Sequence, residues 1–160
     1  MKLNFGPKGM LMIDDARIIF RNFSGEGSMY NREGDRNFAL VIPTEEQADA
    51  LVAEGWNVKV KDPVEEGDTP RMHLPVKVKF NDRGPKVILN SGGKHIELTE
   101  ETVSCLDNID IASVNMDIRP FDWGPINGKT GRTAYLQALE VFQNIDRFSA
   151  KYAEEERFRD

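Results

Sequence analysis

Cysteine, histidine and long apolar runs are scarce in this sequence of 160 residues. Its one cysteine, Cys105, cannot form a disulfide within the chain, which fits a reducing compartment. The two histidines, His73 and His95, have no metal-ligand spacing to each other or to Cys105. No apolar stretch approaches the roughly 20 residues that a membrane helix needs, and the first residues lack the apolar core of a signal peptide. We therefore expect a soluble cytoplasmic protein that uses no metal or other cofactor and does not enter a membrane.

Negative charge predominates, with 27 acidic against 21 basic residues and a net charge of -6. This sum argues against a nucleic-acid-binding protein, whose binding surface is usually basic. The charge is unevenly distributed, however. Residues 56–94 hold 8 basic and 5 acidic residues, whereas residues 1–55 and 95–160 sum to -3 and -6. Because a local basic surface in an acidic protein can still contact a phosphate backbone, the net charge excludes little.

Apolar and polar residues alternate along most of the chain, which predicts a mainly β domain. Valine and lysine alternate most clearly in residues 56–61 and 73–80. In these two strands the valines are expected to point inward and the lysines outward. A turn at residues 81–85 leads from the second of these strands to the next one, which predicts a meander. The expected strands are residues 10–23 (bent), 37–42, 56–61, 73–80, 86–90, 109–118 and 131–142.

Helices are expected to be few and short. Thr44 and Gln47 form a capping-box pattern that opens a helix over residues 44–54, and residues 99–106 are expected to hold a second helical segment. Residues 62–71, rich in proline and acid, are expected to form a solvated loop. With residues 148–160 as a helix or flexible tail, residues 1–147 form a single domain in this prediction.

The segment from Gly124 to Thr130 resembles a phosphate-binding P-loop at first sight. It has three residues between its glycines where that loop needs four, and a strand is expected to follow it rather than a helix. Asn127-Gly128 is a strong hairpin-turn signal in its own right. We therefore interpret the segment as a turn.

Cations and aromatic residues interleave along the expected strands. A cationic groove that follows the phosphates, with ring faces on which bases stack, is how proteins hold single-stranded nucleic acid. The alternative interpretation is that the aromatics belong to the core and the lysines keep the sheet soluble, and Trp123 could equally seal the end of a barrel. The candidate nucleic-acid-binding residues are Arg17, Arg21, Phe23, Arg36, Trp56, Lys59, Lys61, Lys77, Lys79 and Trp123, with Arg119 and Phe121 beside the last.

Two rival functions remain open from the residues alone. A β-rich structural or interaction protein could use the same basic face to meet an acidic partner protein. A metal-dependent nuclease would need clustered carboxylates, and nothing in the sequence brings Asp107, Asp110, Asp117 and Asp122 together. Cys105, between Val103 and Leu106, is expected to be a small buried apolar residue rather than a nucleophile.

Four segments carry a resemblance to a known family: residues 16–25, 31–38, 75–80 and 117–123. Over most of residues 10–145 the chain resembles the OB-fold single-stranded DNA-binding proteins of bacteriophages and prophages. The resemblance implies a partly open Greek-key β-barrel with one or two short helices added. Many such proteins end in a strongly acidic tail that recruits partners. Residues 154–160 differ, because they carry two arginines beside four acids.

The resemblance and the interleaved pattern together predict a non-enzymatic protein that binds single-stranded DNA with little sequence preference. The lysines and arginines would contact phosphates, and Trp56, Phe23 and Trp123 would stack on bases. A role in phage DNA replication or recombination is implied, in the cytoplasm of the host, with replication or recombination proteins or a second copy of the chain as further partners.

Overall fold

The computed structural model describes residues 1–62, 67 and 71–145, and its secondary structure is almost all strand. Most of the expected acidic loop and the whole expected tail lie outside these residues, so both stay predictions. The elements in chain order are β1 (Lys2–Phe5), η1 (Pro7–Gly9), β2 (Leu11–Ala16), β3 (Ile18–Asn22), β4 (Arg36–Ile42), α1 (Glu45–Ala53), β5 (Lys59–Lys61), β6 (Arg71–Val78), β7 (Lys86–Ser91), β8 (Lys94–Leu98), η2 (Val103–Asp107), β9 (Ile111–Ile126) and β10 (Lys129–Gln143).

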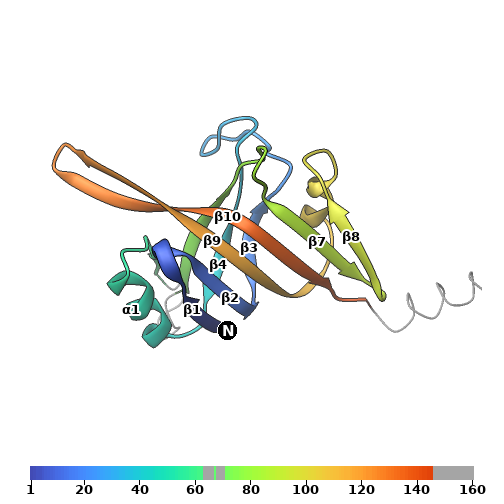
Figure 1. Cartoon of the computed structure of the whole chain (residues 1–160), viewed down its shortest axis with the longest axis horizontal. Helices are drawn as coiled ribbons and strands as arrows, with labels where there is room; N and C mark the ends of the chain where they lie inside the picture. Colours follow the sequence, from blue (N-terminus) through green and yellow to red (C-terminus); the bar gives the residue numbers. More distant parts are fainter. Residues whose placement is uncertain (63–66, 68–70, 146–160) are drawn as a thin grey trace, which may run out of the picture.

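All the described strands belong to one open, curved sheet (Figure 1). Its main path runs β1-β2-β9-β10-β6-β4-β3, while β5 pairs with β6 and the β7–β8 hairpin joins through β10. This mainly β architecture with one α-helix confirms the predicted fold class. The bend expected within residues 10–23 is the break at Arg17, between β2 and β3.

Strands β9 and β10 form a long hairpin that crosses the sheet and projects beyond it (Figure 1). Asn127 and Gly128 both have positive φ, 50° and 77°, and Ile126 pairs with Lys129 around them. Positive φ at both central residues is what a tight two-residue hairpin turn requires. The turn predicted there is confirmed, and the strands on both sides are longer than the sequence pattern predicts.

Strands β6 and β7 lie one after the other along the same edge of β10. β6 pairs in parallel with β10 at Ala134 and Tyr135, and β7 pairs in parallel with it from Ala138 to Phe142. The turn at residues 81–85 therefore does not reverse the chain. The expected meander is wrong here, because β6 and β7 both pair with β10 instead of with each other.

The strand expected at residues 56–61 is reduced to β5. The backbone N–H of Trp56 donates to the Leu51 carbonyl as the chain leaves α1, and the indole side chain of Trp56 is buried. Val60 was expected to point inward but is 61% exposed, because this three-residue strand pairs with β6 alone among the described strands. Lys59 and Lys61 are exposed as predicted.

Helix α1 begins where the sequence predicts. The Thr44 hydroxyl accepts a hydrogen bond from the Gln47 N–H, which satisfies one of the free amides of the first turn. The Gln47 side chain does not return the bond as a capping box would, because its amide donates to the Met1 carbonyl. Ala48 and Leu51 turn toward the core as expected.

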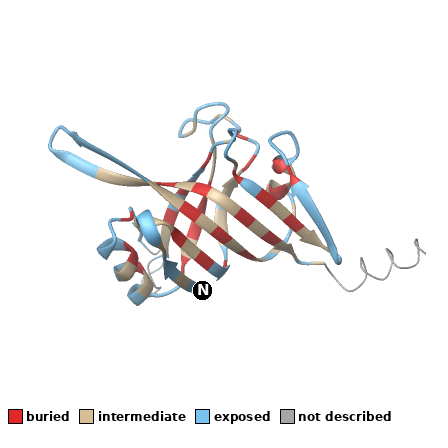
Figure 2. Ribbon diagram, viewed as in Figure 1, coloured by how far each residue is buried: buried red, intermediate tan, exposed pale blue. Residues whose placement is uncertain are grey.

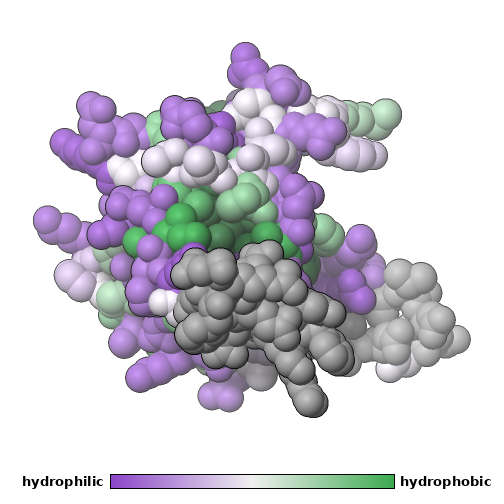
Figure 3. All heavy atoms as spheres, turned by 90° about the vertical axis from the view of Figure 1, so that its right-hand side faces the viewer, coloured by the Kyte–Doolittle hydropathy of each residue, from purple (hydrophilic) through white to green (hydrophobic). Residues whose placement is uncertain are grey.

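The core lies on the concave side of the sheet, and Figure 2 shows buried residues alternating with less buried ones along β9, β10 and β7. This period of two is the strand signature seen in the sequence. Figure 3 views the side near β7 and β8, where apolar side chains gather in the middle of a hydrophilic rim. No helix among the described residues is long and apolar enough to cross a membrane.

Candidate nucleic-acid interface

The outward row of β6 carries the cations of the candidate site. Leu74, Val76 and Val78 are buried, so the alternate residues Pro75, Lys77 and Lys79 face solvent. A row of charges on one face of a strand is the direct result of its two-residue period. Lys77 and Lys79, the second of which directly follows the end of β6, were predicted to contact phosphates, and they therefore share one face.

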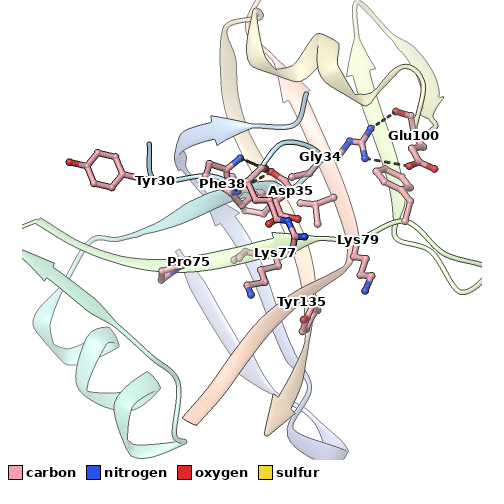
Figure 4. A pocket seen from close by; sticks show the side chains of 16 residues that line it. Tyr30, Gly34, Asp35, Phe38, Pro75, Lys77, Lys79, Glu100 and Tyr135 are labelled. Carbon is pink, nitrogen blue, oxygen red and sulfur yellow. Dashed lines mark hydrogen bonds and ion pairs between the residues drawn. The ribbon is translucent and has the colours of Figure 1, made fainter. Parts of the chain in front are cut away.

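This row borders a hollow of about 880 Å³, here called the β6 groove (Figure 4). Lys77 and Lys79 extend from β6 to the same side in this view, and Tyr135 of β10 lies below them. The residues of the groove used below are Tyr30, Arg36, Lys77, Lys79, Phe80, Glu100 and Tyr135. The groove thus offers both cations and ring systems.

Tyr135 lies next to the lysines because it is the residue of β10 that pairs with Lys77. On its other side it pairs with Arg119 of β9, whose guanidinium carbon lies 5.0 Å from the ring centroid. The Phe121 ring meets it edge-on, with centroids 6.2 Å apart. Such cation–π and T-shaped contacts hold a ring in a defined orientation.

The loop between β3 and β4 holds Tyr30 out into solvent, where its side chain is 94% exposed. The loop is built by its own polar side chains. The Asn31 amide donates to the carbonyls of Glu26 and Asp35, and Asn22 accepts from the Glu26 N–H. An exposed ring on an ordered loop at the edge of a groove can cover a base bound there.

Arg36 is the arginine among the predicted residues that lines the β6 groove. Its Nε donates to the Phe23 carbonyl, its guanidinium lies 5.8 Å from the Phe80 ring centroid, and Nη1 lies 3.4 Å from a Glu100 carboxylate oxygen. The ion pair is partly exposed, so it is weak and salt-sensitive. An arriving phosphate can compete with Glu100 for this cation.

Arg17 and Arg21 do not line the β6 groove. Arg17 is exposed at the break between β2 and β3. The Arg21 guanidinium is turned inward, where Nη1 donates to the carbonyls of Leu106 and Ile109, each at 2.7 Å. Arg21 thus fixes the turn that contains η2.

Phe23 and Trp56 were expected to stack on bases, and the structure places both in the core. Phe23 is fully buried and stacks on Phe38, with centroids 5.2 Å apart. Trp56 is 3% exposed and lies beneath Arg132, whose guanidinium carbon is 5.2 Å from its ring centroid. Neither offers a free ring face in this conformation, so the expectation is corrected to a structural role for both.

The remaining predicted residues lie along the continuation of the same surface. Lys59 and Trp123 line a second hollow next to the β6 groove, and Trp123 is 37% exposed. Lys61 extends over Phe20, with Nζ 5.9 Å from its ring centroid. Phe20 in turn meets the ring of His73 edge-on. Some of the predicted residues therefore lie together, on the outer face of β5, β6 and the β9–β10 hairpin. These are Lys59, Lys61, Lys77, Lys79 and Trp123.

Tyr135 and Tyr30 were not among the predicted residues. Tyr135 sits between the buried residues Ala134 and Leu136, so its outward position could have been found from strand alternation once β10 was assigned. Tyr30 stands in a loop rich in glycine and polar residues, away from any core pattern. A large aromatic residue in such a loop is itself a signal of a binding role.

A metal-dependent nuclease would need clustered carboxylates, and a cysteine nucleophile would need a stabilised thiolate. No three His, Cys, Asp or Glu side chains among those residues gather closely enough to hold a metal ion. Burial and the nearby Asp107 carboxylate raise the pKa of the Cys105 thiol, which disfavours the thiolate. Cys105 was expected to be buried, and the structure shows it partly buried and packed against the core.

Solved structures similar to this fold include single-stranded DNA-binding proteins of a phage. The single-stranded DNA-binding protein from bacteriophage Enc34 matches with a TM-score of 0.55 and 13% identity, over 92% of this chain and 93% of that one. The same protein in complex with ssDNA matches with a TM-score of 0.53 and 14% identity, over 91% and 93%. At these identities the likeness shows a shared OB-like fold. No curated protein matches this chain by sequence.

A family model covers almost the whole sequence. The model matches residues 3–158, which include all of the sheet except the first residue of β1 and all the residues that line the β6 groove. The match agrees with the fold shared with the Enc34 structures and with the family resemblance expected from the sequence. This chain therefore belongs to the family whose model is described as "Putative phage ssDNA-binding domain".

Proposed function

We propose that this chain binds single-stranded DNA in the β6 groove, through phosphate electrostatics and base stacking and without chemical change to the strand. One observation carries the proposal: Lys77 pairs with Tyr135 across β6 and β10, so that a cation and a ring stand side by side on an exposed strand face. Charge next to a ring face is the combination that a single strand requires.

Each part of the groove has a role in this proposal. Lys77, Lys79 and Arg36 neutralise successive phosphates, while the rings of Tyr135 and Tyr30 stack on bases. Lysine is a mobile point charge, and stacking accepts every base, so the sequence preference is low. The excess of acid elsewhere in the chain limits unspecific attachment to other polyanions.

Family membership and the shared fold support this proposal. They also support a role in phage DNA replication or recombination, carried out in the cytoplasm of the host cell. Replication or recombination proteins and a second copy of the chain are further partners in this proposal. Binding requires only charge and ring faces, so we assign no catalytic group.

Titration of a fluorescent oligo-dT with the protein, at low and at high salt, tests the binding. We expect binding that weakens steeply with salt, by about 0.7 log units per tenfold salt for each phosphate neutralised. Incubation with magnesium or manganese should leave the oligonucleotide at full length. Folded protein that does not bind oligo-dT at low salt would exclude the function.

A pair of charge-reversal substitutions tests whether the DNA binds in the β6 groove. Lys77→Glu combined with Lys79→Glu should reduce affinity at least tenfold, because two cations become anions beside the strand. The matched control is Lys2→Glu combined with Lys94→Glu, which makes the same net-charge change on exposed residues of β1 and β8. Equal losses in the two pairs would show that only net charge matters.

A further inference from the structure

A second groove opens where the β9–β10 hairpin leaves β6. Strand β10 pairs with β6 only at Ala134 and Tyr135, because residues 71–73 of the same β6 edge pair with β5. The hairpin must therefore diverge from β6 and project from the sheet (Figure 1). The hollow left between β5, β6 and the hairpin has a volume of about 830 Å³ and is here called the hairpin groove.

Three lysines line the hairpin groove: Lys59 of β5, Lys77 of β6 and Lys129 at the start of β10. All three are exposed, and none makes an ion pair among the described residues. The groove thus collects positive charge from three strands that meet only in the folded chain. A polyanion complements this positive charge better than an apolar peptide, or a peptide without acidic residues, does.

Arg132 holds the two sides of this groove in place. Its Nε and Nη2 donate to the two carboxylate oxygens of Asp122, at 2.7 and 3.1 Å, and Nη1 donates to the Glu54 carbonyl at 3.0 Å. The same guanidinium covers Trp56. Arg132 therefore links the hairpin to the end of α1, and its charge is already engaged.

The position of Trp123 in this groove is fixed by its neighbours. Trp123 pairs with Gly131 across the hairpin, and a methyl group at Gly131 would collide with the indole atoms Cζ2, Cε2 and Nε1. The indole therefore lies against the backbone at residue 131. Trp123 lines the groove and is 37% exposed.

The two grooves adjoin, because Pro75 and Lys77 line both of them. We propose that the hairpin groove is a second compartment for the same single strand, in which a base stacks on Trp123 and phosphates meet Lys59 and Lys129. The proposal rests on the function proposed above for the β6 groove. In this proposal the binding site has two parts. A short oligonucleotide occupies the β6 groove, and a longer one also occupies the hairpin groove.

Oligonucleotide length separates the two compartments. Short oligo-dT fills the β6 groove alone, and longer oligo-dT continues past Lys77 into the hairpin groove. Oligo-dT of about 4 to about 16 nucleotides spans the site sizes known for one OB fold. Affinity should therefore rise in two steps, and tryptophan fluorescence should be quenched only in the second step, because Trp56 is buried and Trp123 is the accessible indole.

The variant Trp123→Leu tests the assignment. We expect a loss of about tenfold in affinity for the long oligonucleotides, as for one lost base stack, and no loss for the shortest that binds. Ile126→Ala is the matched control, because Ile126 is 60% exposed on the same hairpin and does not line the groove. It should leave affinity unchanged at every length.

A second variant avoids any change to the hairpin packing. Lys59→Gln combined with Lys129→Gln should lower the salt dependence for long oligonucleotides and leave that for short ones unchanged. Equal effects of either variant at all lengths, or no effect at any, would overturn the second compartment. Failure of the unmodified protein to bind any oligonucleotide would instead remove the proposed function itself, so the two failures are distinguishable.

Discussion

The guanidinium of Arg119 covers the outward ring of Tyr135, with its carbon 5.0 Å from the ring centroid. The pair is set by register, since the two residues oppose each other in the β9–β10 hairpin and Tyr135 also pairs with Lys77 of β6. A ring whose orientation is fixed by Arg119, next to Lys77 on the neighbouring strand, is prepared to receive a base with little loss of side-chain freedom.

Tyr135→Leu should therefore weaken binding of oligo-dT by about 1–3 kcal/mol, the range for loss of one stacked base. Tyr135→Phe keeps the ring and should bind almost as the unmodified protein does. Fluorescence anisotropy at constant salt measures both. Equal affinity of the leucine and phenylalanine variants would show that Tyr135 does not stack.

Lys77→Gln and Lys79→Gln should each reduce the slope of log affinity against log salt by about 0.7, because each removes one phosphate contact. The slope, more than the affinity at one salt concentration, reports the number of phosphates neutralised. Lys94→Gln is the control, since Lys94 is exposed at the start of β8 and does not line the β6 groove. An unchanged slope in Lys77→Gln would place the strand elsewhere.

Arg21→Ala should destabilise the fold by about 2 kcal/mol and leave oligonucleotide affinity of the folded protein unchanged. The substitution removes two hydrogen bonds from a charged donor and leaves the carbonyls of Leu106 and Ile109 without that partner. Urea unfolding measures the loss, with Arg17→Ala as the exposed control. A large loss of affinity in stably folded Arg21→Ala would restore the binding role first expected for this residue.

His73 should make the stability depend on pH. Partial burial, together with the positive charges of Lys59 and Lys61, lowers its pKa from the ordinary 6.5. The unfolded chain therefore binds this proton more readily than the folded one. The associated stability is fully present above pH 6.5 and is lost as the pH falls through the lower folded pKa. His73→Gln should flatten urea-unfolding stability over this window, and an unchanged pH profile would contradict the shift.

Much of the sheet could be predicted from local pattern. The strands at residues 37–42 and 73–80 and the Asn127-Gly128 turn depend on alternation and turn chemistry within a few residues, and the structure confirms them. Strands β1 and β8 were missed because they are short and mostly exposed, so neither shows clear alternation. Their pairing with β2 and β7 makes them strands.

Other features depend on contacts between distant segments. The parallel pairing of β7 with β10 overturned the expected meander, and no local pattern encodes that partner. Burial of Phe23 and Trp56 likewise could not be predicted, because an aromatic residue fits a core and an exposed strand face equally well in the sequence.

The sequence by itself determined that the chain forms a mainly β domain and that Lys77 and Lys79 share one face of a strand, because they alternate with the apolar Val76 and Val78 at the two-residue period of a strand. Only the tertiary structure decided that Tyr135 stands beside Lys77 and that Lys59, Lys129 and Trp123 meet around one groove. Strand order and register bring these residues together, and both are set by pairings between segments that lie far apart in the chain.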